Sequence, residues 1–323
     1  MSARIKVAIV GATGETGRSV VDGLLAVDGL LAADASFVRN HGFGTSSSLE
    51  KPATASLKAR GVKVVPAELQ GSHDQLVHIL KGIEVVISTI HYQALSDEIF
   101  LANAAKAAGI QRYVPCFWAT VAPRGIMQLR DDKEAILDHV QRLRLPYTVI
   151  DVGWWFQLAV PRIPSGCFDY GLVAPANSVF GDGNVPSALT DVRDIGLYAA
   201  KIISDPRTLN KKVFAFTETW TQNQIFEAVE RVSGERPEST KASAEEMEAN
   251  VARCRQAGSG LNQERAQFEY YHSWGVRGDN SPECAKYLGY VAFEELYPGF
   301  KGRRLTDYLE DLANNKAAKP YSQ

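Results

Sequence analysis

Near the start of the chain, a strand-like segment runs directly into a glycine-rich turn and a helix-like segment. Residues 8–17 read AIVGATGETG, with glycines at Gly11, Gly14 and Gly17. The apolar, branched run before the turn predicts a buried strand, and helical spacing of apolar residues after it predicts a helix. Glycines at this spacing permit a tight turn, close approach of the backbone to a pyrophosphate and close packing of helix on strand. Because the helix also presents N–H groups at its amino end, the stretch predicts a site for the phosphates of a dinucleotide.

Short apolar runs alternate with helical stretches through the rest of the first half. Further strands are expected at 36–38, 63–65, 85–88, 113–115 and 147–151. Helices are expected at 73–80, 96–108 and 130–144. Such alternation predicts an α/β fold whose doubly wound parallel sheet is covered by helices on both faces. Glycine turns also serve purely structural purposes, but a position at the start of this series favours dinucleotide binding.

The regular alternation ends near residue 153. Residues 153–184 carry aromatics, prolines and glycines without a steady period, as expected for a wall of loops and short pieces. The later elements expected from spacing are a helix at 191–203, a strand at 212–216, and helices at 222–232 and 241–257. The tail, residues 316–323, is expected to fray.

Charge and composition exclude several classes of partner. The chain has 323 residues, 45% of them hydrophobic, and its 35 basic residues nearly balance its 37 acidic ones. This balance leaves no excess of positive charge that would attract nucleic acid or an anionic membrane, so we expect neither as a partner. The amino-terminal apolar run is too short for a signal peptide, and no later run approaches a membrane span.

The four cysteines, Cys116, Cys167, Cys254 and Cys284, lie far apart in the sequence. They form no CxxC pair and have no histidine cluster nearby, so neither a metal site nor a disulfide framework is indicated. We therefore expect reduced thiols, no metal and a cytoplasmic location. The sequence leaves both a monomer and a homodimer open.

The residues after the second strand indicate which dinucleotide is bound. The strand is expected to end at Arg39, Ser47 lies among three serines shortly after it, and no acidic residue occurs before Glu50. An acid here selects the ribose hydroxyls of NAD, whereas an arginine suits a phosphorylated ribose. The pattern favours NADP(H); the alternative is a solvated loop arginine.

The turn itself supplies further polar contacts for this cofactor. Thr13 and Thr16 can donate hydrogen bonds to phosphate, and Glu15 lies between them. We therefore count these three residues with the glycines as cofactor-binding.

Several segments, taken in order, resemble the isoflavone reductase-like and NmrA-like branch of the atypical short-chain dehydrogenases. They are VAIVGATGETGRSVVDGLL, SFVRN, EVVISTI, NAAKAAGIQRYVPCFW, KEAILDHVQRLRLPYTVIDVGWWF, FGDGNVPSALTDVRDIGLYAAKIISDPRTLNKKVFAF and WTQNQIFEAVERVSGERPE. The resemblance covers about residues 4–240. It implies an extended Rossmann domain that holds NADPH and a smaller α+β substrate domain from the carboxyl-terminal half.

With this resemblance, the expected domains can be given bounds. The NADP-binding domain is expected over 1–152, with returns to the sheet at about 186–217. The substrate domain is expected over 153–185 and 218–323.

The resemblance also implies a catalytic lysine, and the matching position is Lys133 in RDDKEAILDHV. A lysine near the amino end of a helix is disfavoured by the helix dipole, which suggests that another requirement placed it there. Its ammonium can donate a proton to a substrate atom, and Asp131 and Asp132 can tune or hold it. The alternative, from the charge run alone, is a solvated helix face.

The chain departs from the family where the reductases have PSEFG. Residues 115–119 read PCFWA, without an acid or a glycine. Cys116 can be interpreted as a nucleophile, but no partner base is evident, and a buried thiol beside the cofactor is the preferred interpretation. Trp118 in the same segment is expected to contact substrate.

Two further groups of residues are candidates for the site. Thr89, Ile90 and His91 follow the fourth strand, where such folds pass a loop over the cofactor; His91 is a possible proton carrier. Trp154, Trp155 and Phe156 follow a strand at the sheet edge that binds ligands, so we expect a flat, apolar pocket. Core packing explains at least one of these three equally well.

Three functions remain open from the sequence. The first is an NADPH-dependent reductase of a small, apolar, aromatic or conjugated substrate of secondary metabolism, with Lys133 as general acid or base. The second is a non-redox isomerase, cyclase or rearrangement enzyme on the same scaffold, motivated by PCFWA and the paired tryptophans. The third is an NADP-sensing NmrA-like regulator, which has no need of Lys133.

Overall fold

A computed structural model describes residues 5–26, 31–39, 52–173, 177–256 and 261–320, the side chains of 31–39 excepted. Five parallel strands form the main sheet in the order β3-β2-β1-β4-β5. They are β3 (Val64–Ala67), β2 (Leu31–Arg39), β1 (Ile5–Val10), β4 (Val85–Ser88) and β5 (Arg112–Val114). A parallel bridge from Tyr113 to Tyr147 leads on to β6 (Thr148–Asp151), β10 (Lys211–Phe214) and β13 (Val291–Ala292).

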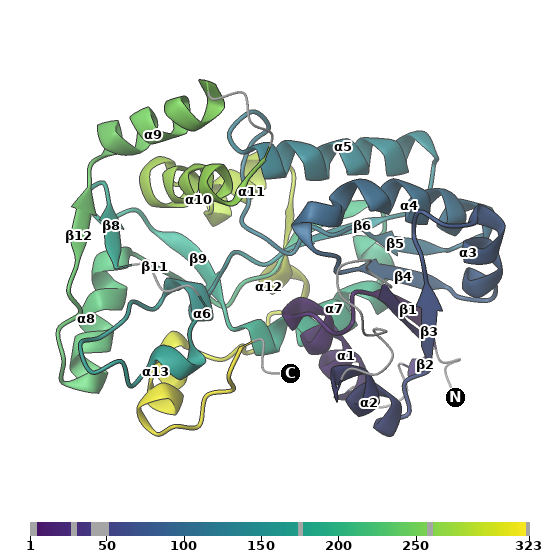
Figure 1. The fold of residues 1–323 in the computed structure, drawn as a ribbon, viewed down its shortest axis with the longest axis horizontal. Helices are drawn as coiled ribbons and strands as arrows, with labels where there is room; N and C mark the ends of the chain where they lie inside the picture. Colours follow the sequence, from purple (N-terminus) through teal and green to yellow (C-terminus); the bar gives the residue numbers. More distant parts are fainter. Residues whose placement is uncertain (1–4, 27–30, 40–51, 174–176, 257–260, 321–323) are drawn as a thin grey trace.

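Helices cover both faces of this sheet, as Figure 1 shows. On one face lie α4 (Glu98–Ala107) and α5 (Gln128–Arg142), with α3 (His73–Leu80) packed against α4. On the other lie α1 (Glu15–Ala26) and α7 (Ile195–Ser204), with α2 (Pro52–Ala59) nearby. The predicted doubly wound α/β fold is confirmed.

The contact of α1 with α7 brings two backbones together through glycine. A Cβ added at Gly196 would lie 1.7 Å from the Ser19 carbonyl oxygen, and one added at Gly23 would lie 2.0 Å from the Gly196 carbonyl carbon. The Gly196 N–H donates to the Ser19 hydroxyl at 2.9 Å. Because only glycine permits this approach, α7 holds the helix that follows the glycine turn firmly in place.

The carboxyl-terminal half contains two small sheets. One has the order β11-β9-β7, and the other pairs β12 with β8. Their strands are β7 (Trp154–Trp155), β8 (Ser178–Phe180), β9 (Ser187–Thr190), β11 (Glu218–Trp220) and β12 (Thr240–Ala242). Strands of two to four residues are too short to show a period, which is why the sequence predicted only loops over 153–184.

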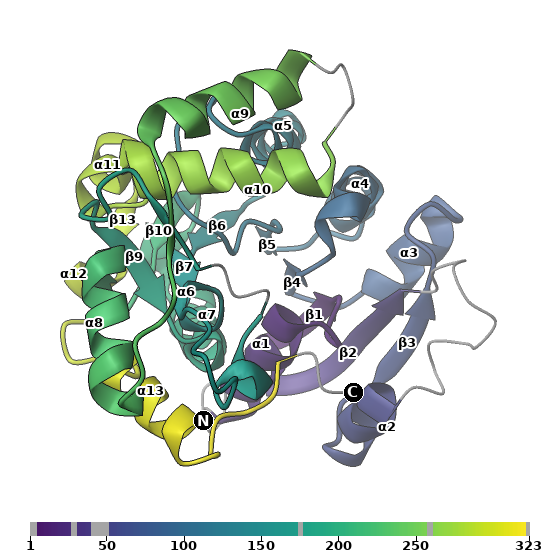
Figure 2. The same cartoon turned by 60° about the vertical axis from the view of Figure 1, so that its left-hand side comes forward.

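Helices enclose these small sheets. The longer ones are α8 (Gln222–Ser233), α9 (Ala244–Gln256), α10 (Gln263–Tyr271) and α13 (Leu305–Ala313); the shorter ones are α6 (Phe156–Ala159), α11 (Pro282–Tyr287) and α12 (Phe293–Leu296). Short 3-10 helices occupy Tyr92–Asp97, Asp169–Gly171, Val192–Asp194 and Pro206–Thr208, and a π turn follows α10 at His272–Arg277. Figure 2 shows α9 and α10 lying side by side next to α5.

The predicted elements differ from the observed ones mainly at their ends. Strand β4 and helix α3 lie where expected, and caps define helix ends well: Ser72 accepts from the Gln75 N–H before α3, and Thr221 and Gln224 form a capping box at α8. Strand β2 begins at Leu31, five residues earlier than predicted, because it pairs with β1 from Ile5 onward. The helix expected over 96–108 starts as a 3-10 turn, and the one expected over 241–257 begins only after β12.

The expectation of a frayed tail is wrong for residues 316–320. Ala317 is buried, and its N–H donates to the Tyr170 hydroxyl at 3.3 Å and to the Asp311 carbonyl at 3.2 Å. The polar composition of the tail gave no sign of Tyr170, which lies nearly 150 residues away along the chain.

The described residues also bear on membranes and metals. None of their helices combines the length and apolar character that a membrane crossing requires. Within the same ranges, no group of three or more His, Cys, Asp and Glu side chains is arranged to hold a metal ion.

Candidate active site

The three glycines of the turn have different surroundings. Gly11 has a φ of +92°, and a Cβ there would lie 2.5 Å from the Thr89 carbonyl oxygen. A Cβ on Gly17 would lie 2.2 Å from the Gly11 carbonyl oxygen, whereas one on Gly14 would meet only that oxygen at an ordinary 3.5 Å. Gly11 and Gly17 are therefore required by the fold itself, and the exposed Gly14 leaves open space beside the backbone.

This open space fits the phosphates of a dinucleotide. The first turn of α1 begins at Glu15, and the first N–H groups of any α-helix lack acceptors within the helix. Thr13 and Thr16 are half-buried beside Gly14, and the Glu15 carboxylate is paired with Arg18. Donors without a bulky side chain in front of them are what a pyrophosphate requires.

Thr89 ties the loop after β4 to the turn. Its N–H and its hydroxyl both donate to the Val10 carbonyl, at 2.8 and 2.9 Å. Ile90 next to it is buried, whereas His91 is exposed and accepts from the Gln93 N–H at 3.4 Å as the cap of a 3-10 turn. The structure thus brings Thr89 and Ile90 up to the glycines and leaves His91 at the surface.

The two residues predicted to recognise the ribose phosphate are only partly placed. Arg39 is the last residue of β2, beside β1, but its side chain is not among those described. Ser47 lies outside the described residues.

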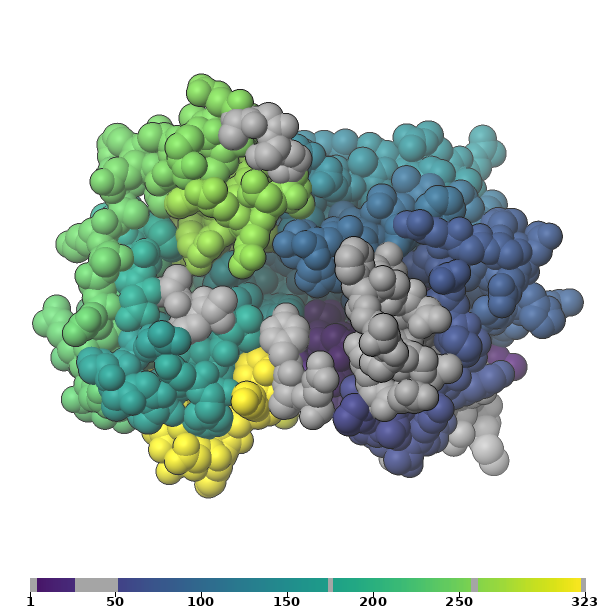
Figure 3. All heavy atoms as spheres, in the orientation of Figure 1, coloured from purple at the N-terminus to yellow at the C-terminus, as the bar shows by residue number. Residues whose placement is uncertain are grey.

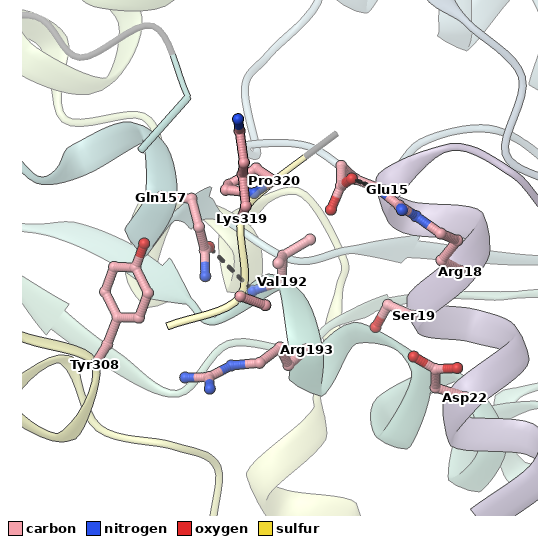
Figure 4. A pocket seen from close by; sticks show the side chains of 11 residues that line it. Glu15, Arg18, Ser19, Asp22, Gln157, Val192, Arg193, Tyr308, Lys319 and Pro320 are labelled. Carbon is pink, nitrogen blue, oxygen red and sulfur yellow. Dashed lines mark hydrogen bonds and ion pairs between the residues drawn. The ribbon is translucent and has the colours of Figure 1, made fainter. Parts of the chain in front are cut away.

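A cavity of about 200 Å³ lies beside the first turns of α1, as Figure 4 shows. Its lining comes from α1, from Gln157, Val192 and Arg193, from α13, and from the tail segment 318–320. Glu15 and Arg18 form one wall, and Lys319 and Pro320 form part of another. The tail therefore reaches the vicinity of the glycine turn, which nothing in the sequence indicated.

Lys133 lies in the second turn of α5 and is buried, with 7% of its surface exposed. Its Nζ donates to the carbonyl of Phe117. Asp131 and Asp132 do not hold it: Asp131 accepts from the Gly125 N–H at 2.7 Å, and Asp132 from the Gln128 side chain at 2.7 Å. The solvated-face interpretation of this charge run therefore fails at Lys133.

Burial lowers the pKa of Lys133, and Arg130 acts in the same direction. Cys116, Asp151 and Glu98 oppose that shift. A lysine whose pKa is lowered by desolvation exchanges its proton more readily near neutral pH than an exposed one does. The amine is therefore suited to general acid or base catalysis.

A buried polar network fixes the part of α5 that carries Lys133. Arg130 donates to Asp151 at 2.8 Å and to Glu134 at 2.7 Å, and Lys212 donates to Glu134 at 2.9 Å. The Tyr290 hydroxyl donates to Asp151 at 2.5 Å and contacts Arg130. Since these residues come from α5, β6, β10 and the segment before β13, the network joins the helix to two strands of the sheet and to the segment that leads into a third.

The first N–H of α5 is held by α10. Glu269 is buried and accepts from the Gln128 N–H at 2.7 Å. Arg255 and Arg265 both donate to its other oxygen at 3.1 Å. Lys133 therefore sits on a helix anchored at its amino end by the carboxyl-terminal half of the chain.

Cys116 is a buried thiol and not an activated nucleophile. Its Sγ donates to the Ile90 carbonyl at 3.2 Å, and burial raises its pKa to about 12. The thiolate is the reactive form of cysteine, so a raised pKa makes this sulfur inert.

Alkylation of the folded protein tests this assignment. At pH 8 iodoacetamide should modify the exposed Cys167 readily and Cys116 far more slowly, because burial raises the pKa of Cys116 and leaves little of it as thiolate. Peptide mass spectrometry measures both rates. In denaturant the two cysteines should react equally; rapid labelling of Cys116 in the folded state would contradict the assignment.

Trp118 is buried in the main core. It has a φ of +40°, its indole N–H donates to the Ser88 carbonyl at 2.7 Å, and its backbone N–H donates to the Ile150 carbonyl at 2.9 Å. Trp118 therefore joins the ends of β4 and β6, through its indole to the first and through its backbone to the second. With 6% of its surface exposed, it offers at most a ring edge to a ligand.

The three aromatics at 154–156 separate in the structure. Trp154 is half-buried in an aromatic cluster, stacked on Trp274 with ring centroids 5.6 Å apart and 5.4 Å from Tyr270. Trp155 is half-buried against the main core. Phe156 is fully buried against Tyr308, so the structure places it in the core and not on a pocket wall.

The aromatic cluster contains two groups that the sequence did not single out. The indole N–H of Trp274 is buried and has no hydrogen-bond partner among the described residues. Burial raises the pKa of Tyr270, whose hydroxyl lies within electrostatic reach of Asp151, Arg130 and Cys116. On the face shown in Figure 3, the surface is hollowed between the light green segment around α10 and the purple amino-terminal segment.

A second cavity, of about 480 Å³, lies between α4 and α5. Its apolar lining includes Tyr92, Leu95, Ile99, Ile136 and Leu261. Asp132, the neighbour of Lys133, adds a polar group.

Comparison with known proteins identifies relatives over nearly the whole chain. The model of the NmrA-like family matches residues 4–307, beyond the limit near 240 expected from sequence motifs alone. Asnovolin J 5′,6′-dehydrogenase of Aspergillus novofumigatus is 46% identical over 322 residues, which cover 95% of each chain. Phenylcoumaran benzylic ether reductase of Ginkgo biloba is 28% identical over 95% of this chain and 98% of its own.

Solved structures share the fold. The complex of leucoanthocyanidin reductase with NADPH from Vitis vinifera superposes with a TM-score of 0.78 at 21% identity, covering 96% of this chain and 99% of that one. A structure described as AtPrR2 with NADP+ and (+)pinoresinol gives a TM-score of 0.76 at 20% identity, covering 97% and 100%. With the family model matching most of its length, this chain belongs to the NmrA-like family, in which it is similar to isoflavone reductase-like enzymes.

Proposed function

We propose that this chain is an NADP(H)-dependent oxidoreductase that transfers a hydride to or from a small, largely apolar, conjugated substrate of secondary metabolism. The observation that carries the proposal is Lys133, a buried amine held on the Phe117 carbonyl beside the strand ends that follow the glycine turn. Relatives named as a dehydrogenase and as reductases support the class of reaction. Solved relatives described with NADPH or NADP+ support the cofactor.

The cofactor is proposed to lie along the carboxyl ends of β1, β2 and β4. Its binding residues are those predicted from the sequence: Gly11, Thr13, Gly14, Glu15, Thr16 and Gly17 at the phosphates, Arg39 and Ser47 at the ribose phosphate, and Thr89, Ile90, His91, Cys116 and Lys133 toward the nicotinamide. When bound, NADP(H) supplies or accepts the hydride. We also propose the division into an NADP-binding domain over 1–152, returning at 186–217, and a substrate domain from the remainder.

Lys133 is proposed to move the proton that accompanies the hydride. In the reducing direction one substrate atom gains the hydride, and the atom that develops negative charge takes the proton from Nζ. In the oxidising direction Nζ takes that proton back. The Phe117 carbonyl fixes the position of Nζ in both directions of the reaction.

The substrate is proposed to lie against the aromatic cluster. Trp154, Tyr270 and Trp274 present ring faces and edges that suit a flat apolar molecule. The unpartnered Trp274 N–H provides one hydrogen-bond donor, which suits a substrate that carries a carbonyl or ether oxygen. Trp118 and Trp155 contribute at the edge of this surface, and Phe156 does not contribute.

Replacing Arg39 with alanine tests the cofactor preference. Loss of a charge-assisted pair with a phosphate should weaken NADPH binding about 10- to 100-fold, equivalent to about 1.4 to 2.8 kcal/mol, and leave NADH binding nearly unchanged. Fluorescence titration with both nucleotides measures the change. The control is Arg60→Ala, which removes an arginine that forms an ion pair with Asp22 of α1. Equal weakening for both nucleotides would contradict the assigned role.

Turnover measurements test the proposed function itself. NADPH oxidation and NADP+ reduction are followed by nicotinamide absorbance against a panel of conjugated and polycyclic ketones, enones and benzylic ethers. Stoichiometric cofactor consumption supports the proposal. Product formed without NADP(H) would instead indicate an isomerase or cyclase, and NADP(H) binding that only modulates capture of a transcription factor would indicate a regulator.

A further inference from the structure

A further buried acid, Glu98, contacts the segment that holds Lys133. Glu98 is the first residue of α4 and is 1% exposed. Its Oε1 accepts from the Cys116 N–H at 2.9 Å and from the Tyr113 hydroxyl at 3.0 Å. A carboxylate at the amino end of a helix is also stabilised by the helix dipole. Neither the motifs nor the proposed reaction assigns this residue a role.

Glu98 and Lys133 both form hydrogen bonds with the same short stretch of backbone. Glu98 holds the amide of Cys116, and Lys133 donates to the carbonyl of the next residue, Phe117. The residue after that, Trp118, has a φ of +40°, a conformation that costs energy for a bulky side chain. Such a backbone persists only if its neighbours are anchored, so the position of the Phe117 carbonyl depends on Glu98.

The two side chains also interact through charge. Lys133 lowers the pKa of Glu98, and Glu98 raises that of Lys133. The net effect of burial is stronger and raises the pKa of Glu98 to about 7. The other titratable groups that face Glu98 are Tyr113 of β5 and Cys116 of the following loop.

Further groups act on Lys133 itself. Arg130, on the same helix, disfavours the positive charge of Lys133, and Asp151, in β6, favours that charge. Asp97, the residue before Glu98, accepts a hydrogen bond from the Gln70 side chain at 2.7 Å.

We propose that Glu98 is a positioning residue for Lys133: it fixes the backbone at Cys116, one residue before the Phe117 carbonyl that holds Nζ, and its negative charge keeps the amine protonated. This role rests on the proposed function of Lys133 as the proton-moving group. It gives the site a pair of groups, one acid and one base, whose protonation is linked across a short stretch of backbone.

Glu98→Gln and Tyr113→Phe form a matched pair for the test. Glutamine retains an oxygen that accepts from the Cys116 N–H but removes the charge. Phenylalanine retains the carboxylate and removes one of its donors. If Glu98 served only to hold the backbone, the two variants would behave alike.

NMR titration of isotope-labelled lysine provides a readout that needs no substrate. The Lys133 signal, assigned by its absence in Lys133→Met, should titrate at a lower pH in Glu98→Gln than in the wild type, because an opposite charge nearby has been removed. In Tyr113→Phe, which keeps the carboxylate, it should titrate close to the wild-type pH. An unchanged Lys133 titration in Glu98→Gln would overturn the proposal.

Kinetics then link the charge to turnover. In the reducing direction the basic limb of the kcat/KM profile should shift to lower pH in Glu98→Gln by the same amount, with KM nearly unchanged. A shifted NMR titration with an unshifted kinetic profile would show that Lys133 is not the proton donor, and the proposed function would fail separately. If both the kcat/KM profile and the Lys133 titration of Glu98→Gln match those of the wild type, the role of Glu98 is rejected and the proposed function of Lys133 is not.

Discussion

Replacing Lys133 with methionine is expected to lower kcat by about 10²- to 10⁴-fold, the range for loss of a positioned general acid or base. Methionine keeps an apolar stem in the buried space beside Phe117 but lacks the amine that donates to the Phe117 carbonyl. The phosphate contacts of the cofactor do not involve this side chain. NADPH affinity should therefore change by no more than about threefold, which corresponds to about 0.7 kcal/mol.

Steady-state kinetics and fluorescence titration of the same preparation separate the two quantities. Lys106→Met, on the exposed side of α4, is a control that removes a lysine outside the site. Unchanged turnover in Lys133→Met with intact NADPH binding would rule out the proton-moving role.

Gly14→Ala is expected to weaken cofactor binding without loss of stability, whereas Gly17→Ala is expected to lower the stability of the fold. A Cβ on Gly14 makes only an ordinary 3.5 Å contact within the protein, so the fold should keep its full stability. The same methyl group occupies the space proposed for the pyrophosphate and should weaken NADPH binding about 10- to 100-fold, or about 1.4 to 2.8 kcal/mol. Alanine at position 17 would lie 2.2 Å from a backbone oxygen and should destabilise the fold by about 3 kcal/mol.

Thermal unfolding without cofactor and NADPH titration below the transition measure the two effects. The turn is primarily structural if Gly14→Ala binds NADPH as tightly as the wild type. Full stability of Gly17→Ala would instead contradict the close packing described for the start of α1.

Local sequence patterns predicted much of the sheet because its strands are buried on both faces. Residues 85–87 form an uninterrupted apolar run, and residues 73–80 follow an N-cap and have helical spacing, so both elements lie where they were expected. The start of β2 could not be predicted, because pairing with β1 extends it through residues without a strand pattern. The short strands in the second half could not be predicted for the same reason, because they are defined by pairing with strands distant in sequence.

The candidate site was predictable only where one segment carries its chemistry. The glycine turn and Lys133 lie within recognisable local motifs. Glu98, Tyr113 and Tyr290 carry no such signal, because their roles come from side chains and peptides 15 or more residues away. The charge run alone would suggest a solvated helix face, but helical geometry turns Arg130, Lys133 and Glu134 inward, while Asp131 and Asp132 stay half-exposed.

Deuterium transfer tests the central claim most directly. The protein is incubated with a substrate found in the turnover panel and with NADPH that carries deuterium at the transferable position of the nicotinamide, and the product is analysed by mass spectrometry. An NADP(H)-dependent oxidoreductase predicts one deuterium in each reduced product molecule, at carbon, and one equivalent of NADP+ formed. Product without deuterium, formed at the same rate when NADPH is omitted, would contradict the proposed hydride transfer.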